Sequence, residues 1–420
     1  MTIAIVGCGI SGLTCAYYLT QSGYDVRLFE AENYVGGHTH TVPVKSGEKT
    51  YAVDTGFIVY NSQTYPHFCT LLKSIGLEGQ NTDMSFSVSD RLSNFEYSGG
   101  SLLGLFAQKK LLLSKKFYHF LKKIYDTQRI LKKILNDSDS SEETLQSFVK
   151  RNKIDEKVIQ HYLYPLISAL WSSPFESVEK MPVYFVAHFF ENHGLLRMIP
   201  NVDWKVIPGG SFSYIAPLIR HFSDKIYLNT KVEKIETADN NIKLYSGEGG
   251  LGVFEKVIIA THSDQALKLL KEPTSLQTCI LSSIPYQKNI AVLHKDKNLM
   301  PIHKKAWASW NYLIKPENTK QAILTYYMNK LQGIRSEEDF FVTLNSDDQI
   351  APEKIIQTFE YHHPQFSLDS QTAQKQHRAL NQEGNIHFCG AYWGFGFHED
   401  GVKSGLRVCE QITGKKLLHE

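Results

Sequence analysis

The chain has 420 residues, a formal net charge of +2 at pH 7 and six cysteines that form no CxxC pair. A chain of this length is too long for a single hydrophobic core, so we expect two lobes. The balanced charge argues against a nucleic-acid partner. The scattered cysteines indicate neither a zinc site nor a disulfide framework. No apolar run is long enough to span a bilayer, and a strand beginning at residue 2 or 3 leaves no room for a signal peptide, so we expect a cytoplasmic protein.

The first thirty residues are typical of a dinucleotide-binding unit. Strand-like runs at 3–6 and 26–29 flank a helical pattern at 13–22, and the first run enters the helix through Gly7-Cys8-Gly9-Ile10-Ser11-Gly12. In such a turn the first glycine allows the tight bend, the second lets a pyrophosphate approach, and the third lets the helix pack on the strand. The helix N-terminus then faces the anion.

The acidic residue and the glycines that follow predict FAD as the ligand. Glu30 ends the second strand with a carboxylate suited to the ribose hydroxyls of an adenosine. Six residues later, Gly36-Gly37-His38 resembles the extended fingerprint of FAD-binding oxidoreductases related to the flavin amine oxidases. A second GxGxxG match, at 247–252, links two predicted strands with no helix behind it, so we interpret it as a hairpin turn and expect no NADPH site.

The middle of the chain predicts a helical lobe. Before it, the run at 51–60 is broken at Gly56, which indicates either a strand with a bulge or a backbone that lies close to a flat ligand. A helix begins near Pro66, and residues 102–193 carry further helical patterns. Residues 115–135 form a basic amphipathic helix, for which we weigh two explanations: the solvated face of a cap lobe, or peripheral docking to an anionic membrane or lipid.

The second half returns to a mixed pattern. Ser211 is predicted to cap a helix that reaches about residue 221, and residues 231–237 are one of several predicted strands that follow it. Between 266 and 380, alternating helical and extended segments predict a sheet that walls a substrate cavity. A strand at 386–390 and a helix at 401–412 return to the nucleotide unit.

These elements predict an α/β fold with a discontinuous Rossmann-like FAD-binding domain, plus an α+β substrate domain with a helical cap lobe. We expect residues 1–62, 204–265 and 381–420 in the FAD-binding domain. Residues 63–203 and 266–380 then form the substrate and cap domain.

Together the motifs resemble the flavin amine oxidase superfamily over almost the whole chain. The segments 36–41, 54–61, 306–312 and 396–401 are closer to a bacterial branch of NAD/FAD-binding, amine-oxidase-like proteins. Members of that branch are often encoded beside cyclopropane-fatty-acid synthases, which implies a lipid or fatty-acyl substrate. The superfamily implies an FAD-dependent enzyme that transfers hydride from a C–N or C–C unit of a small-molecule substrate to flavin N5.

The resemblance also implies which residues contact FAD. A helix N-terminus at Gly401 and Val402 would direct backbone N–H groups at the flavin N1/O2 edge. The full set assigned to the cofactor is Gly7, Gly9, Ile10, Ser11, Gly12, Glu30, Ala31, Gly36, Gly37, His38, Thr39, Gly56, Phe57, Val232, Gly390, Phe397, His398, Gly401 and Val402.

The chain departs from the family pattern beside the expected flavin. Tyr392 follows Gly390-Ala391 where an acidic residue after the glycine is common, His38 replaces an arginine, and His398 replaces a tyrosine of the amine-binding aromatic cage. The family's lysine near flavin N5 falls at Lys288 or Asn289, and Lys288 is the catalytic candidate. His398 either poises a proton near neutral pH or forms a hydrogen-bonded wall of the cofactor site.

Three functions remain open at this point. The histidine pairs at 38–40 and 362–363 lack companion ligands, so we expect no metal site. An oxidase, dehydrogenase or desaturase is favoured, and the missing cage favours dehydrogenation of an acyl chain. The alternatives are a flavin-dependent isomerase or mutase without net redox change, and a flavin-binding protein that acts through a partner.

Overall fold

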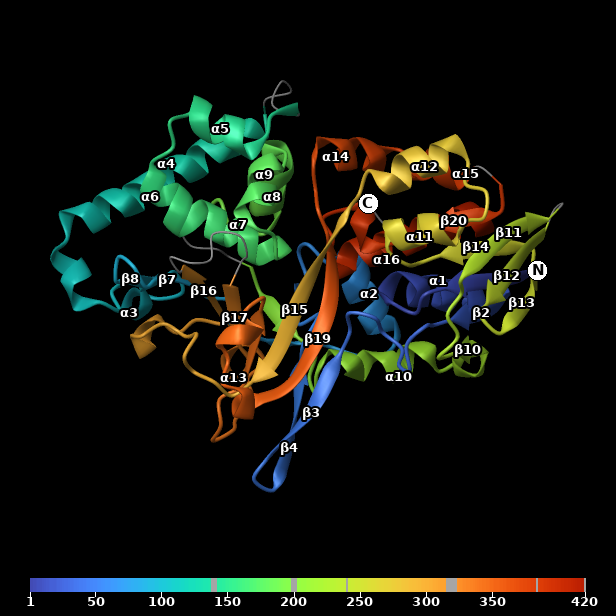
Figure 1. Ribbon diagram of the computed structural model, residues 1–420, viewed down its shortest axis with the longest axis horizontal. Coiled ribbons are helices and arrows are strands. Elements are labelled where there is room, and N and C mark those ends of the chain that lie inside the picture. Colours follow the sequence, from blue (N-terminus) through green and yellow to red (C-terminus); the bar gives the residue numbers. More distant parts are fainter. Residues whose placement is uncertain (137–141, 198–201, 239–240, 315–322, 383, 419–420) are drawn as a thin grey trace.

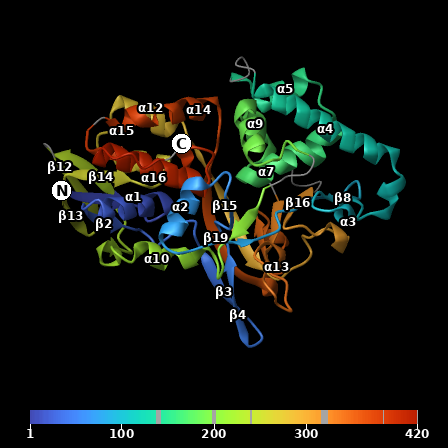
Figure 2. The ribbon, with the colours of Figure 1, turned by 180° about the vertical axis from the view of Figure 1, so that it is seen from behind.

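The computed structural model describes residues 1–136, 142–197, 202–238, 241–314, 323–382 and 384–418. A lobe built on a parallel sheet lies at one end and a helical lobe at the other, with a long antiparallel sheet between them (Figures 1 and 2). Both chain ends lie in the parallel-sheet lobe (Figure 1). This arrangement confirms the predicted α/β fold with a second, mixed part.

The parallel sheet is covered on both faces because successive side chains of a strand point in opposite directions. Ile3 and Ile5 join a hydrophobic cluster with the first and last helices, whereas Ala4 and Val6 join a cluster with a three-stranded antiparallel sheet. In spatial order the parallel strands are β10 (Ile226–Tyr227), β2 (Asp25–Phe29), β1 (Thr2–Val6), β14 (Lys256–Ile259) and β20 (Ile386–Phe388).

The structure confirms that the segment at 247–252 belongs to a hairpin: residues 247–248 form its turn, and residues 249–252 begin the second strand. The turn joins two antiparallel strands with no helix behind them, as in an ordinary β-turn connection. The predicted strand at 231–237 begins only at Lys234, so Val232 lies before it, buried in the same cluster. The covering strands and helices of this lobe are β11 (Lys234–Ala238), β12 (Asn241–Ser246), β13 (Gly249–Phe254), α1 (Ile10–Gln21), α2 (Pro66–Ser74), α10 (Ile215–Ile219), α11 (Ser263–Leu269), α12 (Ser275–Ser282), α14 (Leu368–Lys375), α15 (His377–Gln382) and α16 (His398–Thr413).

The central sheet is antiparallel except where β16 and β7 run parallel. Its order is β19 (Ile355–Pro364), β15 (Tyr286–His294), β18 (Phe341–Leu344), β17 (Ile323–Tyr327), β16 (Trp310–Ile314), β7 (Phe86–Asp90) and β8 (Phe95–Ser98). The long strands β15 and β19 form the edge beside the parallel-sheet lobe (Figure 1). Shorter strands and one helix lie beside this sheet: β3 (Thr41–Ser46), β4 (Lys49–Asp54), β5 (Val59–Asn61), β6 (Gln80–Asn81), β9 (Trp204–Val206) and α13 (Met328–Leu331).

The helical lobe is formed by the segment predicted to be helical. The longest helix, α4, buries Phe117, Phe120 and Leu131 and turns its lysines outward, as its pattern predicts. In the described part of the chain, no helix is both long enough and apolar enough to cross a membrane. The helices are α3 (Leu102–Leu105), α4 (Lys115–Ile134), α5 (Leu145–Arg151), α6 (Glu156–Val158), α7 (Tyr164–Trp171), α8 (Phe175–Lys180) and α9 (Val183–Asn192).

The prediction that Ser211 caps a helix is wrong. Ser211 begins a 3₁₀ turn, and its N–H and hydroxyl donate to the buried carboxylate of Asp54 at 2.8 and 3.0 Å. The Thr41 hydroxyl and the Gln332 side-chain amide donate to the same carboxylate. A buried carboxylate needs several hydrogen-bond donors, and Ser211 provides two of those that Asp54 accepts. Ser211 therefore connects two segments that are distant in the sequence.

Candidate cofactor and substrate site

The glycine turn after β1 has the geometry that its spacing predicts. Gly7 has a φ of +100°, and a Cβ on Gly12 would lie 2.1 Å from the Gly7 carbonyl oxygen, so both positions require glycine for the fold itself. Gly9 is different: a Cβ there would meet no atom within 4 Å. Space is therefore open outside the backbone of Gly9, where a pyrophosphate is expected to approach.

Glu30 is held at the end of β2 by backbone donors. Its carboxylate accepts the N–H of Cys8 at 2.7 Å and the N–H of Glu32 at 3.0 Å. The first bond fixes the carboxylate against the glycine turn, and the neighbouring Ala31 is exposed. This position is compatible with the predicted contact to a ribose.

The second glycine pair packs directly on the first turn. The N–H of Gly36 donates to the carbonyl of Cys8 at 2.9 Å, and a Cβ on Gly37 would lie 3.3 Å from the Cα of Gly9. Gly36 and Gly37 have φ values of +125° and +58°, which favour glycine. Two loops that are separated in the sequence by α1 and β2 thus form one cradle around Gly9.

The first turns of α1 and α16 meet at this cradle. A Cβ on Gly401 would lie 2.7 Å from Ile10 Cγ2 and 3.0 Å from Ser11 Oγ, so glycine permits the close approach. However, α16 begins at His398, three residues earlier than predicted, and the Gly401 N–H donates to the Phe397 carbonyl. The prediction of an N-terminal N–H at Gly401 is therefore wrong, and Val402 lies farther inside the helix, buried in the core.

Gly56 is required by protein packing. The Phe57 N–H donates to the His38 carbonyl at 2.7 Å, and a Cβ on Gly56 would lie 2.2 Å from the same oxygen. The His38 ring lies beside Tyr361, His363 and His262, at centroid distances of 5.1, 5.6 and 6.1 Å. Within the described residues, its buried Nε2 has no hydrogen-bond partner.

Burial keeps this histidine group neutral. Burial, followed by the charges of neighbouring histidines, lowers the pKa of His38 to about 4 and those of His262 and His363 to about 3. An uncharged ring with a free Nε2 beside the glycine cradle can donate to or accept from a polar cofactor atom. The open space at Gly9 and this free nitrogen both fit the predicted FAD.

His398 is built into a polar network. Its Nε2 lies 3.0 Å from Thr39 Oγ1 and 3.3 Å from Tyr214 Oη, and its ring stacks on Phe57 at 3.5 Å. Burial, followed by the effect of nearby His38, lowers the pKa of His398 well below its usual value. Of the two roles considered, this geometry favours a hydrogen-bonded wall.

Lys288 faces the wrong way for the predicted catalytic role. Its Nζ pairs with Glu360 at 2.5 Å, and both side chains are about half exposed. Strand alternation places the next residue, Asn289, inside: its Nδ2 lies 2.9 Å from His363 Nδ1, and its Oδ1 accepts from Asn345 at 2.8 Å. The lysine prediction is therefore wrong, and period-two counting along β15 would have identified Asn289 as the inward residue.

Aromatic side chains connect the start of α16 to the helical lobe. Phe397 stacks on Phe189 at 5.0 Å, and the Trp171 indole donates to the Phe395 carbonyl at 2.9 Å. The surrounding ring cluster consists of Trp171, Phe185, Phe189, Phe366, Phe395 and Phe397. We call this cluster the aromatic wall; its rings are largely buried against one another, so the boundary between the helical lobe and the start of α16 is apolar.

At Gly390, after the last strand of the parallel sheet, the space beside the backbone is filled by the ring of Tyr392. A Cβ on Gly390 would collide with the Tyr392 ring, and the Gly390 N–H donates to Ser404 Oγ at 2.9 Å. Tyr392 is buried, and its hydroxyl has no partner within the described residues. Across those same residues, no three His, Cys, Asp or Glu side chains form a group suited to a metal ion.

Comparison with known proteins identifies the family. The model of the family described as flavin containing amine oxidoreductase matches residues 10–293. The chain is 23% identical over 293 residues to coproporphyrinogen III oxidase of Staphylococcus aureus and 23% identical over 278 residues to 1-hydroxycarotenoid 3,4-desaturase of a Flavobacterium species. These matches cover 62% and 59% of this chain but only 60% and 53% of those relatives.

A third relative and a solved structure extend the comparison. Polyenoic fatty acid isomerase of Ptilota filicina is 24% identical over 273 residues, covering 56% of this chain and 51% of that protein. Cyclohexylamine oxidase from Brevibacterium oxydans has the same fold, with a TM-score of 0.71 at 15% identity over 98% of both chains. The match to the family model covers more than half of the sequence and runs from α1 through the helical lobe to all but the last residue of β15. The chain therefore belongs to the flavin containing amine oxidoreductase family, and its cofactor is FAD.

Proposed function

We propose that this family member catalyses the two-electron oxidation of a C–C or C–N unit in an apolar substrate, with a fatty-acyl or other lipid chain as the favoured class. The observation that carries the proposal is the aromatic wall that joins α7 and α9 to the segment before α16. FAD, when bound, supplies the two-electron acceptor.

The residues beside the cradle support an uncharged substrate. His38, His262 and His363 are held neutral by burial, and Lys288 is turned to solvent. His398 replaces the family's cage tyrosine and is stacked on Phe57. The family's aromatic cage tyrosine is therefore absent from position 398, and the lysine at position 288 does not point into the site. Both features favour dehydrogenation of a C–C unit within the proposed class.

The protein's own residues have three tasks in this proposal. Gly9, Gly37 and Glu30 hold the dinucleotide, and the meeting helix N-termini stabilise negative charge through their dipoles. The aromatic wall orients the chain of the substrate and excludes water. Neutral Asn289 and His38 provide hydrogen bonds without charge.

A second candidate is an isomerase that moves a double bond without net oxidation. The polyenoic fatty acid isomerase among the relatives supports it, because an isomerase of this kind would act on the same class of apolar chain. The desaturase relative supports the first candidate. A flavin-binding protein that acts only through a partner is the third.

One experiment separates these functions. Purified protein loaded with FAD is mixed under argon with saturated and unsaturated fatty acids, phospholipids, polyamines and aromatic amines, and the flavin absorbance is followed while products are analysed by mass spectrometry. The proposal is supported if a lipid bleaches the flavin absorbance and yields a product with two hydrogens fewer than that lipid. Bleaching by amines alone contradicts the lipid class, a product of unchanged mass identifies the isomerase, and no product from any substrate favours the partner role.

A further inference from the structure

The far end of the helical lobe exposes an unusual group of apolar side chains. Leu113 is 92% exposed and Leu102 is 76% exposed, although each lies in a helical turn. Soluble surfaces seldom gather several such residues without a function. The other exposed apolar side chains of this end are Leu103, Leu112, Tyr118 and Ile302.

The same end carries a local excess of positive charge. Between Glu96 and Asp126 the sequence has six lysines and neither aspartate nor glutamate, whereas the whole chain has a net charge of only +2. The turn with Lys304 and Lys305 packs against α3 and adds two exposed lysines. The six lysines are Lys109, Lys110, Lys115, Lys116, Lys122 and Lys123.

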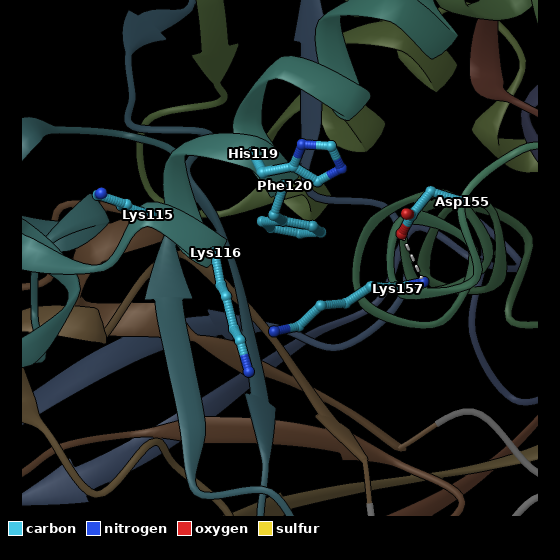
Figure 3. A pocket seen from close by; sticks show the side chains of 6 residues that line it. All are labelled: Lys115, Lys116, His119, Phe120, Asp155 and Lys157. Atoms are coloured by element: carbon cyan, nitrogen blue, oxygen red, sulfur yellow. Dashed lines mark hydrogen bonds between the residues drawn. The ribbon is translucent and has the colours of Figure 1, made fainter.

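A hollow of about 380 Å³ lies among these lysines, at the start of α4 (Figure 3). Lys115, Lys116, His119 and Lys157 line it beside the Phe120 ring. Its one carboxylate, Asp155, accepts the backbone N–H of Lys157 at 3.0 Å and thereby caps α6. Among the described residues, no ion pair within 4.0 Å joins a carboxylate to the ammonium group of any of these three lysines. The Lys157 ammonium lies over the Phe95 ring, 4.8 Å from its centroid, an arrangement that leaves its positive charge uncompensated by an anion.

We propose that α3, the turn at 109–113 and the first half of α4 form a docking surface for an anionic phospholipid bilayer. We call it the lysine–leucine surface. Its leucines enter the boundary between headgroups and acyl chains, its lysines contact lipid phosphates, and the hollow at Lys116 and Lys157 receives one phosphate group. Charge complementarity selects this occupant, because exposed leucines and exposed lysines alternate along the same turn and the first residues of the helix that follows it.

This surface goes beyond the proposed function and does not depend on it. An enzyme with either a lipid or a soluble substrate could dock in this way, and docking is measured without turnover. A lysine and a leucine near a bilayer act through different forces, so their contributions are separable.

The test is co-sedimentation of the FAD-loaded protein with vesicles. Vesicles of phosphatidylcholine alone are compared with vesicles that also contain phosphatidylglycerol, at low and high salt. We expect binding only to the anionic vesicles and weaker binding at high salt. The double variant Lys115→Gln/Lys116→Gln should bind about thirtyfold more weakly, and Leu112→Ser/Leu113→Ser about tenfold more weakly.

Matched changes elsewhere serve as controls. Lys45→Gln/Lys49→Gln removes two exposed lysines from the β3–β4 hairpin, and Val253→Ser removes an apolar side chain that is 56% exposed on β13. These variants should bind like the unaltered protein, and all variants should keep its melting temperature and FAD content. The proposal is overturned by absence of binding at low salt, by equal binding to neutral vesicles, or by equal losses in the controls. Gel filtration showing a dimer that the Leu112/Leu113 variant abolishes would assign the surface to a second copy instead.

Discussion

Gly9 and Gly12 lie three residues apart in one turn, and their different surroundings allow cofactor binding to be separated from folding. Gly9 has an ordinary extended backbone, with a φ of −72° and a ψ of 179°, and open space beyond its Cα. At Gly12 an added methyl group would meet the Gly7 backbone. The two alanine variants should therefore fail for different reasons.

We expect Gly9→Ala to unfold in urea like the unaltered apoprotein but to lose at least tenfold in FAD affinity, because its methyl group occupies the space of the pyrophosphate. Gly12→Ala should lose about 1–3 kcal/mol of stability through overpacking, even without FAD. Urea unfolding of the apoproteins and titration with FAD measure both effects. Equal FAD affinity in Gly9→Ala and the unaltered protein would show that the pyrophosphate does not lie there.

Two adjacent residues on β15, Lys288 and Asn289, provide a second pair of contrasting variants. Lys288→Met should leave the rate of flavin reduction within about twofold and stability within about 0.5 kcal/mol, because its ion pair with Glu360 is exposed. Asn289→Ala should cost about 1–3 kcal/mol, since His363 and Asn345 lose their buried partner. Urea unfolding and rapid-reaction absorbance test this contrast. A large loss of flavin reduction in Lys288→Met would restore the catalytic lysine.

At the scale of elements, α16 joins α1 and α2. Glycine at Gly401 and Gly405 lets it approach α1, where a Cβ on Gly405 would lie 2.9 Å from the Ser11 carbonyl. Its first turn also holds α2: the Glu399 carboxylate accepts the N–H groups of His67 and Phe68 and lies 2.6 Å from His67 Nδ1. Glu399 thus satisfies N–H groups that the start of α2 cannot bond internally.

Replacing this carboxylate should loosen α2. In Glu399→Gln one oxygen becomes an NH₂ group that faces N–H donors, so we expect a loss of about 1–3 kcal/mol. Hydrogen exchange should rise in residues 66–74 more than in α4, which serves as the internal reference. Uniform acceleration throughout the chain would contradict a local role for Glu399.

At the scale of the whole molecule, buried neutral histidines predict sensitivity to acid. Burial lowers the pKa of His377 to about 4, whereas an unfolded histidine titrates near 6.5. Between these values the unfolded chain binds more protons, so stability is complete above about pH 6.5 and falls as pH drops toward 4. His262, His363 and His38 act in the same direction.

At pH 5 each fully buried group of this kind should cost about 2 kcal/mol relative to pH 7. His377→Gln removes one titrating group while its amide can still donate to the Phe388 carbonyl, which His377 contacts at 2.8 Å. The variant should therefore show a shallower fall in urea stability between pH 7 and pH 5. An unchanged slope would show that His377 is not neutral in the fold.

The sequence by itself determined the nucleotide unit, the hairpin at 247–252 and the helical lobe. Each depends on side chains that are close along the chain: a glycine turn between a strand and a helix, period-two alternation, or an apolar stripe on a helix. For this reason the sequence places Gly7, Gly9 and Gly12 in one turn and Glu30 after the second strand, where the structure also has them. The fold class followed because these units pack in few ways.

Only the tertiary structure decided which residues face the site. Asn289 meets His363 across two strands, Ser211 meets Asp54, and Gly56 meets His38, so each role depends on a partner from another segment. The same holds for α16, whose start at His398 is set beside α1 and α2. Local patterns specify elements because they reflect backbone geometry and solvent exposure, whereas contacts between distant residues exist only after the elements have packed.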